Sequence, residues 1–154
     1  MRCNLAPIMT ERAGPKAVLD TNVLVSGLMG GDGPPQQILN AWLHERFTLV
    51  TSPYLVAELT HVLSYPKIAD RIELSEAEID AILAALLSQA KAVPGNLELR
   101  GVTCDAKDDA VVACAVEAGA DYIVSGDQDL LVLSVYEGVQ MIAPGQFVEI
   151  LSAR

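Results

Sequence analysis

The chain of 154 residues is 51% hydrophobic and 19% charged, a composition that excludes a disordered chain and is long enough to bury one core. Its net charge of −10 argues against a broad basic surface of the kind that binds nucleic acids. No apolar run approaches the roughly 18 residues that cross a bilayer, and no signal-peptide pattern is present, so we expect a cytoplasmic protein.

Short apolar segments alternate with amphipathic ones along most of the chain. Residues 1–15 are a polar, proline-containing lead-in, and residues 16–154 form a single domain without repeats or linkers. We predict strands over 16–20, 47–51, 122–124 and 140–142. We predict helices over 23–29, 34–45, 54–64, 75–91 and 107–118, and a short terminal helix after 144–146.

This alternation predicts an α/β fold with three layers, α/β/α. The strands should form a parallel, twisted sheet of four to five strands with helices on both faces. Helix starts are predicted at Thr21 and Asn22, at Ser52, and at the capping box that Ser75 opens, because these residue types cap helices. Gly119 should end the fifth helix.

Acidic residues stand where the carboxyl ends of strands are predicted. Asp20 closes the first strand, and Asp127 follows the 122–124 strand after two small residues. Ligands of an open parallel sheet bind outside the carboxyl ends of its strands. Asp is also a good helix N-cap. For either residue taken alone, helix capping and ligand binding are therefore equal alternatives.

Glu58 borders the apolar stripe of its predicted helix. It lies three residues after Leu55 and four before Val62, where a carboxylate is uncommon unless something positive pairs with it. The alternative is a glutamate at the edge of the buried face that extends to solvent.

The densest acidic cluster, residues 105–109, opens the helix that carries Val112. Acids are favoured in a first helical turn, so part of this cluster needs no function. Asp108 lies on the line of Val112 and should point inward. Asp109, displaced by about a third of a turn, is the second candidate for the same role, and the sequence leaves that choice open.

These acids together predict one pocket at the carboxyl edge of the sheet. Carboxylates that close repel one another and require divalent cations, and oxygen ligands suit Mg²⁺ or Mn²⁺. The net charge then has two interpretations: a solvated acidic surface, or carboxylates that cations neutralise.

Cysteines and histidines offer no competing site. Three widely spaced cysteines, Cys3, Cys104 and Cys114, contain no C-x-x-C pair and indicate reduced thiols, with Cys114 in a helix core. We interpret the two histidines, His44 and His61, as surface residues.

The sequence resembles the PIN domain family over residues 17–151. The resemblance rests on motifs in order: Leu19-Asp20-Thr21-Asn22-Val23-Leu24, Glu58 within 56–59, and the segments 105–109, 118–131 and 142–147. The subgroup it resembles is that of prokaryotic toxins related to VapC-type ribonucleases. That subgroup often has Asp-Pro before its third acid, where this chain has Asp105-Ala106.

The resemblance implies hydrolysis of RNA phosphodiester bonds, with one or two Mg²⁺ or Mn²⁺ ions held by Asp20, Glu58, Asp108 and Asp127. Two such ions lie about 4 Å apart in two-metal sites and serve the attacking and leaving oxygens. Further ligands would be Asp109 and Asp129, and the residues that orient ligands would be Asn22 and Ser125.

The subgroup also implies an RNA substrate, a cognate antitoxin and a homodimer. The long helix from Ser75 carries apolar residues that either pack in the core or face such a partner. Two other functions stay open. A haloacid-dehalogenase-like phosphatase needs a second acid two residues after Asp20, where this chain has Asn22. A PIN-like module that binds RNA or protein without cutting is the other.

Overall fold

The computed structural model describes residues 14–72 and 74–153, so Cys3 and most of the predicted lead-in lie outside the described residues. One sheet has the strand order β3-β2-β1-β4-β6-β5. Its strands are β1 (Lys16–Leu19), β2 (Thr48–Thr51), β3 (Lys91–Ala92), β4 (Tyr122–Val124), β5 (Val135–Tyr136) and β6 (Val139–Ile142). Neighbouring strands are parallel except β5, which pairs with β6 in the antiparallel sense.

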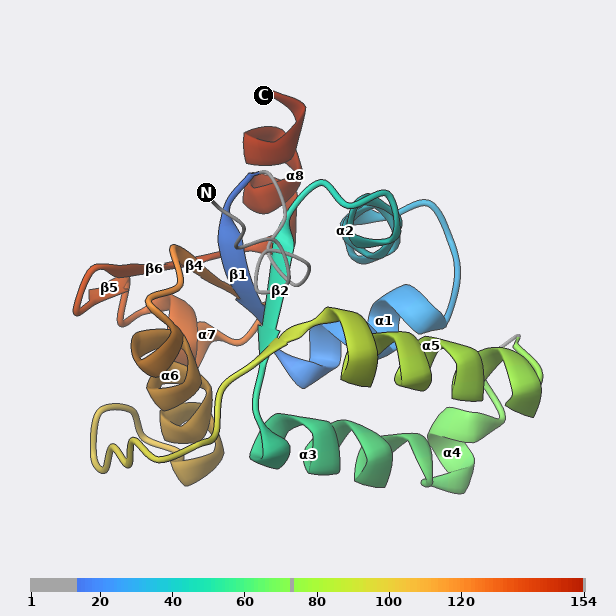
Figure 1. Cartoon of the computed structure of the whole chain (residues 1–154), viewed down its shortest axis with the longest axis horizontal. Coiled ribbons are helices and arrows are strands. Elements are labelled where there is room, and N and C mark those ends of the chain that lie inside the picture. The colour runs from blue at the N-terminus through green and yellow to red at the C-terminus, as the bar shows by residue number, and fades with distance from the viewer. Residues whose placement is uncertain (1–13, 73, 154) are drawn as a thin grey trace, which may run out of the picture.

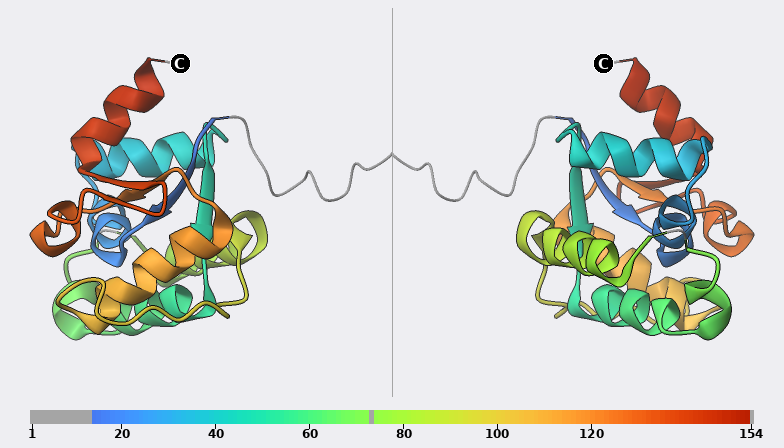
Figure 2. Two further views of the ribbon diagram at one scale, coloured as in Figure 1. Left: turned by 90° about the vertical axis from the view of Figure 1, so that its left-hand side faces the viewer. Right: turned by 90° about the vertical axis from the view of Figure 1, so that its right-hand side faces the viewer.

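Helices cover both faces of this sheet, which confirms the predicted α/β/α architecture (Figures 1 and 2). The helices are α1 (Thr21–Leu28), α2 (Pro34–Leu43), α3 (Pro53–Leu63), α4 (Pro66–Ala69), α5 (Glu76–Gln89), α6 (Ala106–Ala118), α7 (Gln128–Leu131) and α8 (Pro144–Ser152). No helix among the described residues has the length and hydropathy needed to span a membrane.

Strand β1 shows how the two layers are built. Its side chains alternate between faces, so that Ala17 and Leu19 pack with α1, α2 and α8, whereas Val18 packs with α6. All three residues are at most 4% exposed. A strand buried on both faces is apolar throughout, which is why this segment has no polar alternation.

The four predicted strands are present, but the sheet has six strands where four to five were predicted, and its edge strand β5 is antiparallel. Two edge strands and two one-turn helices were not predicted. The strands β3 and β5 have two residues each, and α4 and α7 have four each. Segments of this length show no periodicity. The predicted helix over 75–91 ends at Gln89 because Lys91 already pairs with Val50 in the sheet.

Most predicted helix ends are confirmed. Ser52 Oγ accepts a hydrogen bond from the Leu55 amide at 3.4 Å, and Ser75 and Glu78 form the expected capping box. Gly119 ends α6 with φ of 64°. The prediction that Thr21 and Asn22 cap α1 is wrong, because Asp20 occupies the N-cap position and α1 starts at Thr21, two residues before the predicted start at 23.

The order of the strands creates a crevice beside β1. The chain passes from β1 to β2 on one side and returns to β4 on the other side, so the connections diverge between β1 and β4. The Asp20 amide donates to the Val124 carbonyl at 3.0 Å, which places the residues after β1 and β4 side by side. Such a switch point is where open α/β sheets bind ligands.

Candidate metal centre

The four acids Asp20, Glu58, Asp108 and Asp127 line one cavity of about 180 Å³ at this switch point. They come from four different segments: the ends of β1 and β4, the middle of α3 and the first turn of α6. The other residues that line the cavity are Thr21, Asn22, Val62, Asp105, Lys107 and Val111. We call this cavity the acidic cleft.

Asp20 is oriented by a buried hydroxyl. It is 7% exposed, and its Oδ2 accepts a hydrogen bond from Ser125 Oγ at 2.8 Å. Asp20 is the N-cap residue of α1, as the capping alternative predicted, but its side chain makes no capping hydrogen bond. Burial raises the pKa of Asp20, the Ser125 hydrogen bond opposes that rise, and the charges of Glu58 and Asp127 add to it.

Ser125 joins two of the acids. It is fully buried, and its Oγ also accepts a hydrogen bond from the Asp127 amide at 2.9 Å. One hydroxyl therefore ties the carboxylate after β1 to the backbone that carries the carboxylate after β4. That Ser125 orients metal ligands stays a prediction.

Glu58 is held toward the cleft by the first residue of α1. Its Oε2 accepts a hydrogen bond from Thr21 Oγ1 at 2.8 Å, and its neighbours on α3, Leu55 and Leu59, are buried. Glu58 is half-buried and does not extend freely into solvent. The role of Thr21 was missed because its type and position indicated a helix cap.

Asp108 is buried with one carboxylate oxygen unpaired among the described residues. It is 6% exposed, and no described residue donates a hydrogen bond to its Oδ2. Burial, followed by the charges of Asp127 and Asp20, raises its pKa to about 7. An unpaired buried carboxylate oxygen of this kind is typical of a group whose partner is a cation.

Asp109 faces a different part of the molecule. Its carboxylate accepts hydrogen bonds from the amides of Gly101 at 3.0 Å and Thr103 at 2.7 Å, and from Thr103 Oγ1 at 2.9 Å. Burial alone would raise the pKa of Asp109, but the bonds from Thr103 and Gly101 hold it below its usual range. Asp109 braces the loop before α6 and does not line the acidic cleft.

Asp127 and Asp129 complete a tight group with Asp108. Carboxylate oxygens of these three residues all lie within 4.8 Å of one another. Asp127 caps α7 with Oδ1, which accepts from the Asp129 amide at 2.9 Å. Asp20 and Glu58 lie outside this group although they line the same cleft. An all-oxygen set with an unpaired buried oxygen fits a hard divalent cation.

The remaining predicted residues take ordinary positions. Asn22 is exposed at the edge of the cleft. His44 and His61 are exposed and do not line the cleft, and Cys114 is buried in α6. Ala106, which replaces the proline of the resembled subgroup, is the first residue of α6. Proline would also suit that first helical position, so both residue types fit the start of a helix there.

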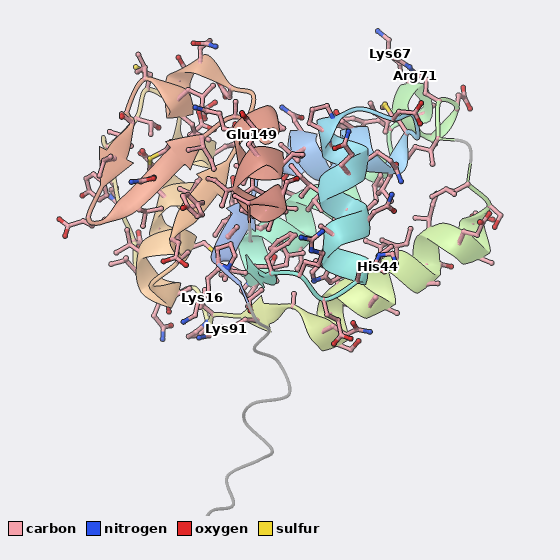
Figure 3. The ribbon with its side chains drawn as sticks, turned by 90° about the horizontal axis from the view of Figure 1, so that it is seen from above. Lys16, His44, Lys67, Arg71, Lys91 and Glu149 are labelled. Carbon is pink, nitrogen blue, oxygen red and sulfur yellow. The ribbon has the colours of Figure 1, made fainter. Side chains whose placement is uncertain are left out.

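Lys107 is the one cationic residue among the described residues that line the cleft. The six other described cations lie elsewhere: Lys16, Arg46, Lys67, Arg71, Lys91 and Arg100. Figure 3, a view from above that of Figure 1, labels four of them, Lys16, Lys67, Arg71 and Lys91. A phosphate that enters the cleft therefore meets one lysine and a set of carboxylates.

Fold and cleft together define an α/β protein with an acidic centre at the carboxyl edge of a parallel sheet. The PIN domain family matches residues 16–129, and the chain belongs to this family. PIN domains are generally metal-dependent nucleases and typically bind divalent metals, and the acidic group of Asp108, Asp127 and Asp129 is compatible with that chemistry.

Two individual proteins resemble the chain. It is 32% identical over 123 residues to the uncharacterised protein MJ1680 of Methanocaldococcus jannaschii. The matched region covers 80% of this chain and 77% of that protein. The crystal structure of PAE2754 from Pyrobaculum aerophilum superposes with a TM-score of 0.59 at 18% identity, covering 91% of each chain. The second similarity shows the fold alone.

Proposed function

We propose that this chain is a Mg²⁺- or Mn²⁺-dependent endoribonuclease that hydrolyses RNA phosphodiester bonds. The observation that carries the proposal is the buried Asp108 Oδ2, which no described residue satisfies, beside the carboxylates of Asp127 and Asp129. Leaving a buried polar group unpaired costs about 1–3 kcal/mol, and more for a charged one. A bound cation would remove that cost.

The ion or ions would be held by Asp20, Glu58, Asp108 and Asp127, with Asp129 as a further ligand. When bound, such an ion lowers the pKa of water and neutralises charge on phosphoryl oxygens. The chain's own contribution is orientation, because Ser125 fixes Asp20 relative to the Asp127 backbone.

Substrate binding is proposed to depend on the cation more than on the protein surface. With a net charge of −10 the chain repels a polyanion at long range. Lys107 is the cationic side chain available inside the cleft, and we assign it a contact to a phosphate of the RNA. RNA binding without a divalent cation is therefore expected to be weak.

The test compares wild type with Asp20→Asn on defined RNAs, with Mn²⁺ and with a chelator. Wild type should cut only with the cation, and the variant should lose on the order of 100-fold or more in rate. Asp80→Asn makes the same change at an exposed position of α5 and should cut like wild type. Thermal unfolding checks that each variant is folded.

Three outcomes would contradict the proposal. Equal cutting by Asp20→Asn would remove Asp20 from the centre. Tight RNA binding without cutting at saturating Mn²⁺ would indicate a non-catalytic PIN-like module. Release of phosphate from small phosphomonoesters, with RNA left intact, would indicate a phosphatase.

We further propose that the chain is the toxin of a type II toxin–antitoxin pair, acting as a homodimer with a cognate antitoxin. The resemblance of its motifs to that subgroup supports this role. An apolar hollow of about 390 Å³ between α3 and α5 supports a protein partner, and it is bordered by Leu87, which is 65% exposed. Light scattering of wild type and Leu87→Asp tests the dimer. A monomeric wild type would contradict the homodimer.

A further inference from the structure

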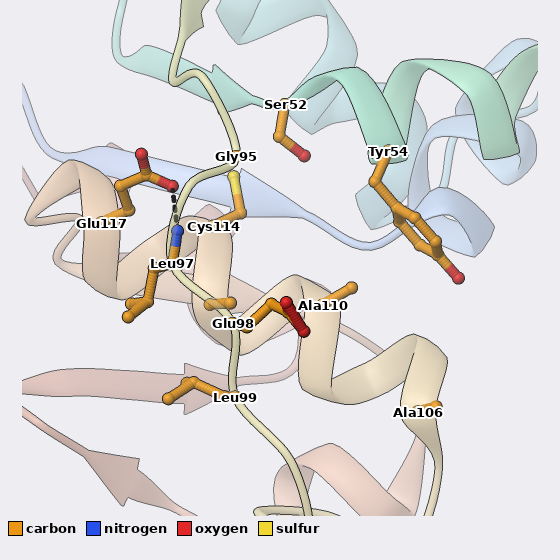
Figure 4. Close-up of a pocket in the computed structure, with 11 residues that line it drawn as sticks. Ser52, Tyr54, Gly95, Leu97, Glu98, Leu99, Ala106, Ala110, Cys114 and Glu117 are labelled. Atoms are coloured by element: carbon orange, nitrogen blue, oxygen red, sulfur yellow. Dashed lines mark hydrogen bonds between the residues drawn. The ribbon is translucent and has the colours of Figure 1, made fainter.

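A second hollow of about 190 Å³ lies between α6, the start of α3 and the extended segment before α6 (Figure 4). The residues that line it are Ser52, Tyr54, Gly95, Leu97, Glu98, Leu99, Ala106, Ala110, Ala113, Cys114 and Glu117. Pockets for drug-sized ligands have volumes of about 300–1,000 Å³, so this hollow suits one small ring system. We call it the side pocket.

The side pocket and the acidic cleft are bordered by the same two helices. From α3, Tyr54 lines the pocket and Glu58 lines the cleft. From α6, Ala110 lines the pocket and Asp108 lines the cleft. Tyr54 and Glu58 are one helical turn apart, a rise of about 6 Å. The pocket and the cleft are therefore neighbours along α3.

The walls of the side pocket suit a flat ring. Residues Gly95, Ala106, Ala110 and Ala113 have no bulky side chain and leave one side open. Tyr54, 47% exposed, offers an aromatic ring at the border of the pocket. Aromatic rings of this kind are platforms on which nucleobases stack.

One edge of the pocket is braced by a carboxylate. The two oxygens of Glu117 accept hydrogen bonds from the amides of Asn96 at 3.3 Å and Leu97 at 3.4 Å. These bonds hold the extended segment against α6. Deep in the pocket, burial raises the pKa of the Cys114 thiol to about 12, so that surface is uncharged at neutral pH.

Glu98 supplies the polar group that would select a base. Its carboxylate pairs with Arg100 at 3.0 Å, and both side chains are largely exposed, at 73% and 88%. An exposed pair of this kind is weak and exchanges easily. A carboxylate only accepts hydrogen bonds. It therefore favours a base edge with adjacent donors and repels one that presents carbonyls.

We propose that the side pocket binds the base of the nucleotide next to the cleaved phosphate, and that it prefers guanine. Guanine offers two neighbouring N–H donors on its Watson–Crick edge to Glu98, while its ring stacks on Tyr54. Uracil presents two carbonyls on that edge and is disfavoured. This inference rests on the proposed nuclease function, which puts the cleaved phosphate in the acidic cleft.

The test measures cleavage of RNAs that carry each base at the positions flanking the cut. Wild type should prefer guanine at one such position. Ala110→Met fills the pocket and Tyr54→Ala removes the platform, so each should reduce that preference by on the order of 10-fold. Glu98→Gln should lower the preference for guanine. Ala84→Met, the same change at an exposed site on α5, should not.

A second measurement separates this proposal from the nuclease function. Metal-free wild type is titrated with guanosine and uridine monophosphates while backbone amide NMR signals are followed. Guanosine monophosphate should shift the signals of Gly95, Leu97 and Ala110 at lower concentration than uridine monophosphate does.

Each result decides one of the two proposals. If wild type cuts RNA without base preference, or Ala110→Met and Tyr54→Ala keep the wild-type preference, the side-pocket proposal is overturned and the nuclease stands. If wild type cuts no RNA, the nuclease proposal fails and the titration still decides the pocket. Shifts confined to the pocket would support it, and their absence would overturn it.

Discussion

Replacing Asp108 by asparagine should stabilise the metal-free protein while it removes a proposed metal ligand. Burial and neighbouring acids raise the pKa of this carboxyl from 3.8 to about 7. One pKa unit corresponds to about 1.4 kcal/mol. Allowing for partial access of water through the cleft, ionised Asp108 lowers the free energy of unfolding by about 2–4 kcal/mol above pH 7.

The sign of this effect depends on pH in a defined way. The pKa of Asp108 in the folded protein is higher than in the unfolded chain. Its protonated form therefore contributes fully to stability below about pH 4, and this contribution is lost as pH rises from about 4 through 7. Asp108→Asn should match wild type near pH 4 and exceed it increasingly up to pH 7.

Asp109→Asn is the matched control, because the same atoms change one residue away. This carboxylate accepts three hydrogen bonds, from Gly101 and Thr103. Hydrogen bonds to a charged group contribute about 1.5–3 kcal/mol each. Asparagine keeps one acceptor oxygen and loses the other together with the charge, so the variant should lose about 2–4 kcal/mol at pH 8. The pKa of Asp109 lies below its usual range. That stabilisation is therefore present above about pH 4 and is lost as pH falls further.

The assay is urea unfolding between pH 4 and 8 in a chelator, followed by thermal unfolding with Mn²⁺. For a chain of this length, 2–4 kcal/mol corresponds to roughly 5–15 °C. Mn²⁺ should raise the unfolding temperature of wild type and have little effect on Asp108→Asn. If both asparagine variants are less stable than wild type at pH 8, the argument for an uncompensated charge at Asp108 is wrong.

Three further predictions concern the surroundings of the acids and the packing of α1 against α2. Ser125→Ala leaves Asp20 Oδ2 and the Asp127 amide without their shared partner; it should cost about 1–3 kcal/mol in urea unfolding and lower the cleavage rate 10–100-fold, unlike the exposed change Ser88→Ala. Lys107→Met should tighten Mn²⁺ binding, weaken RNA binding and reduce the salt dependence of RNA affinity by about 1 in slope. Calorimetry measures the Mn²⁺ affinity, and RNA binding at several salt concentrations measures the other two. Unchanged RNA affinity would refute a phosphate contact. Gly27→Val should lower stability by about 1–3 kcal/mol, because a Cβ there lies 3.0 Å from the Pro35 carbonyl oxygen; wild-type stability in thermal unfolding would show that α1 and α2 can separate at no cost.

The parallel sheet and the general location of the cleft were predictable from sequence. Short apolar runs followed by Asp20 and Asp127 place acids at one edge of a parallel sheet, whatever the details of packing. Glu58 was predictable as an uncommon acid beside a buried stripe. Its partner Thr21 was not, because a hydrogen bond between residues 37 positions apart leaves no local pattern.

Periodicity could not separate Asp108 from Asp109 because α6 is buried on more than one side. Residues 111–115 are all buried, as are both acids, so the helix shows no solvent-facing stripe that would orient it. One side packs on the sheet and another meets the loop that contains Gly101 and Thr103.

Local sequence thus determined which segments become strands and helices and which edge of the sheet carries the acids, since both follow from short-range patterns of apolar and polar residues. Only the tertiary structure decided which carboxylate is satisfied and which is not. Solvation and hydrogen bonding of a buried acid depend on groups that distant segments bring to it: Ser125 for Asp20, Thr103 for Asp109, and no described donor for Asp108 Oδ2.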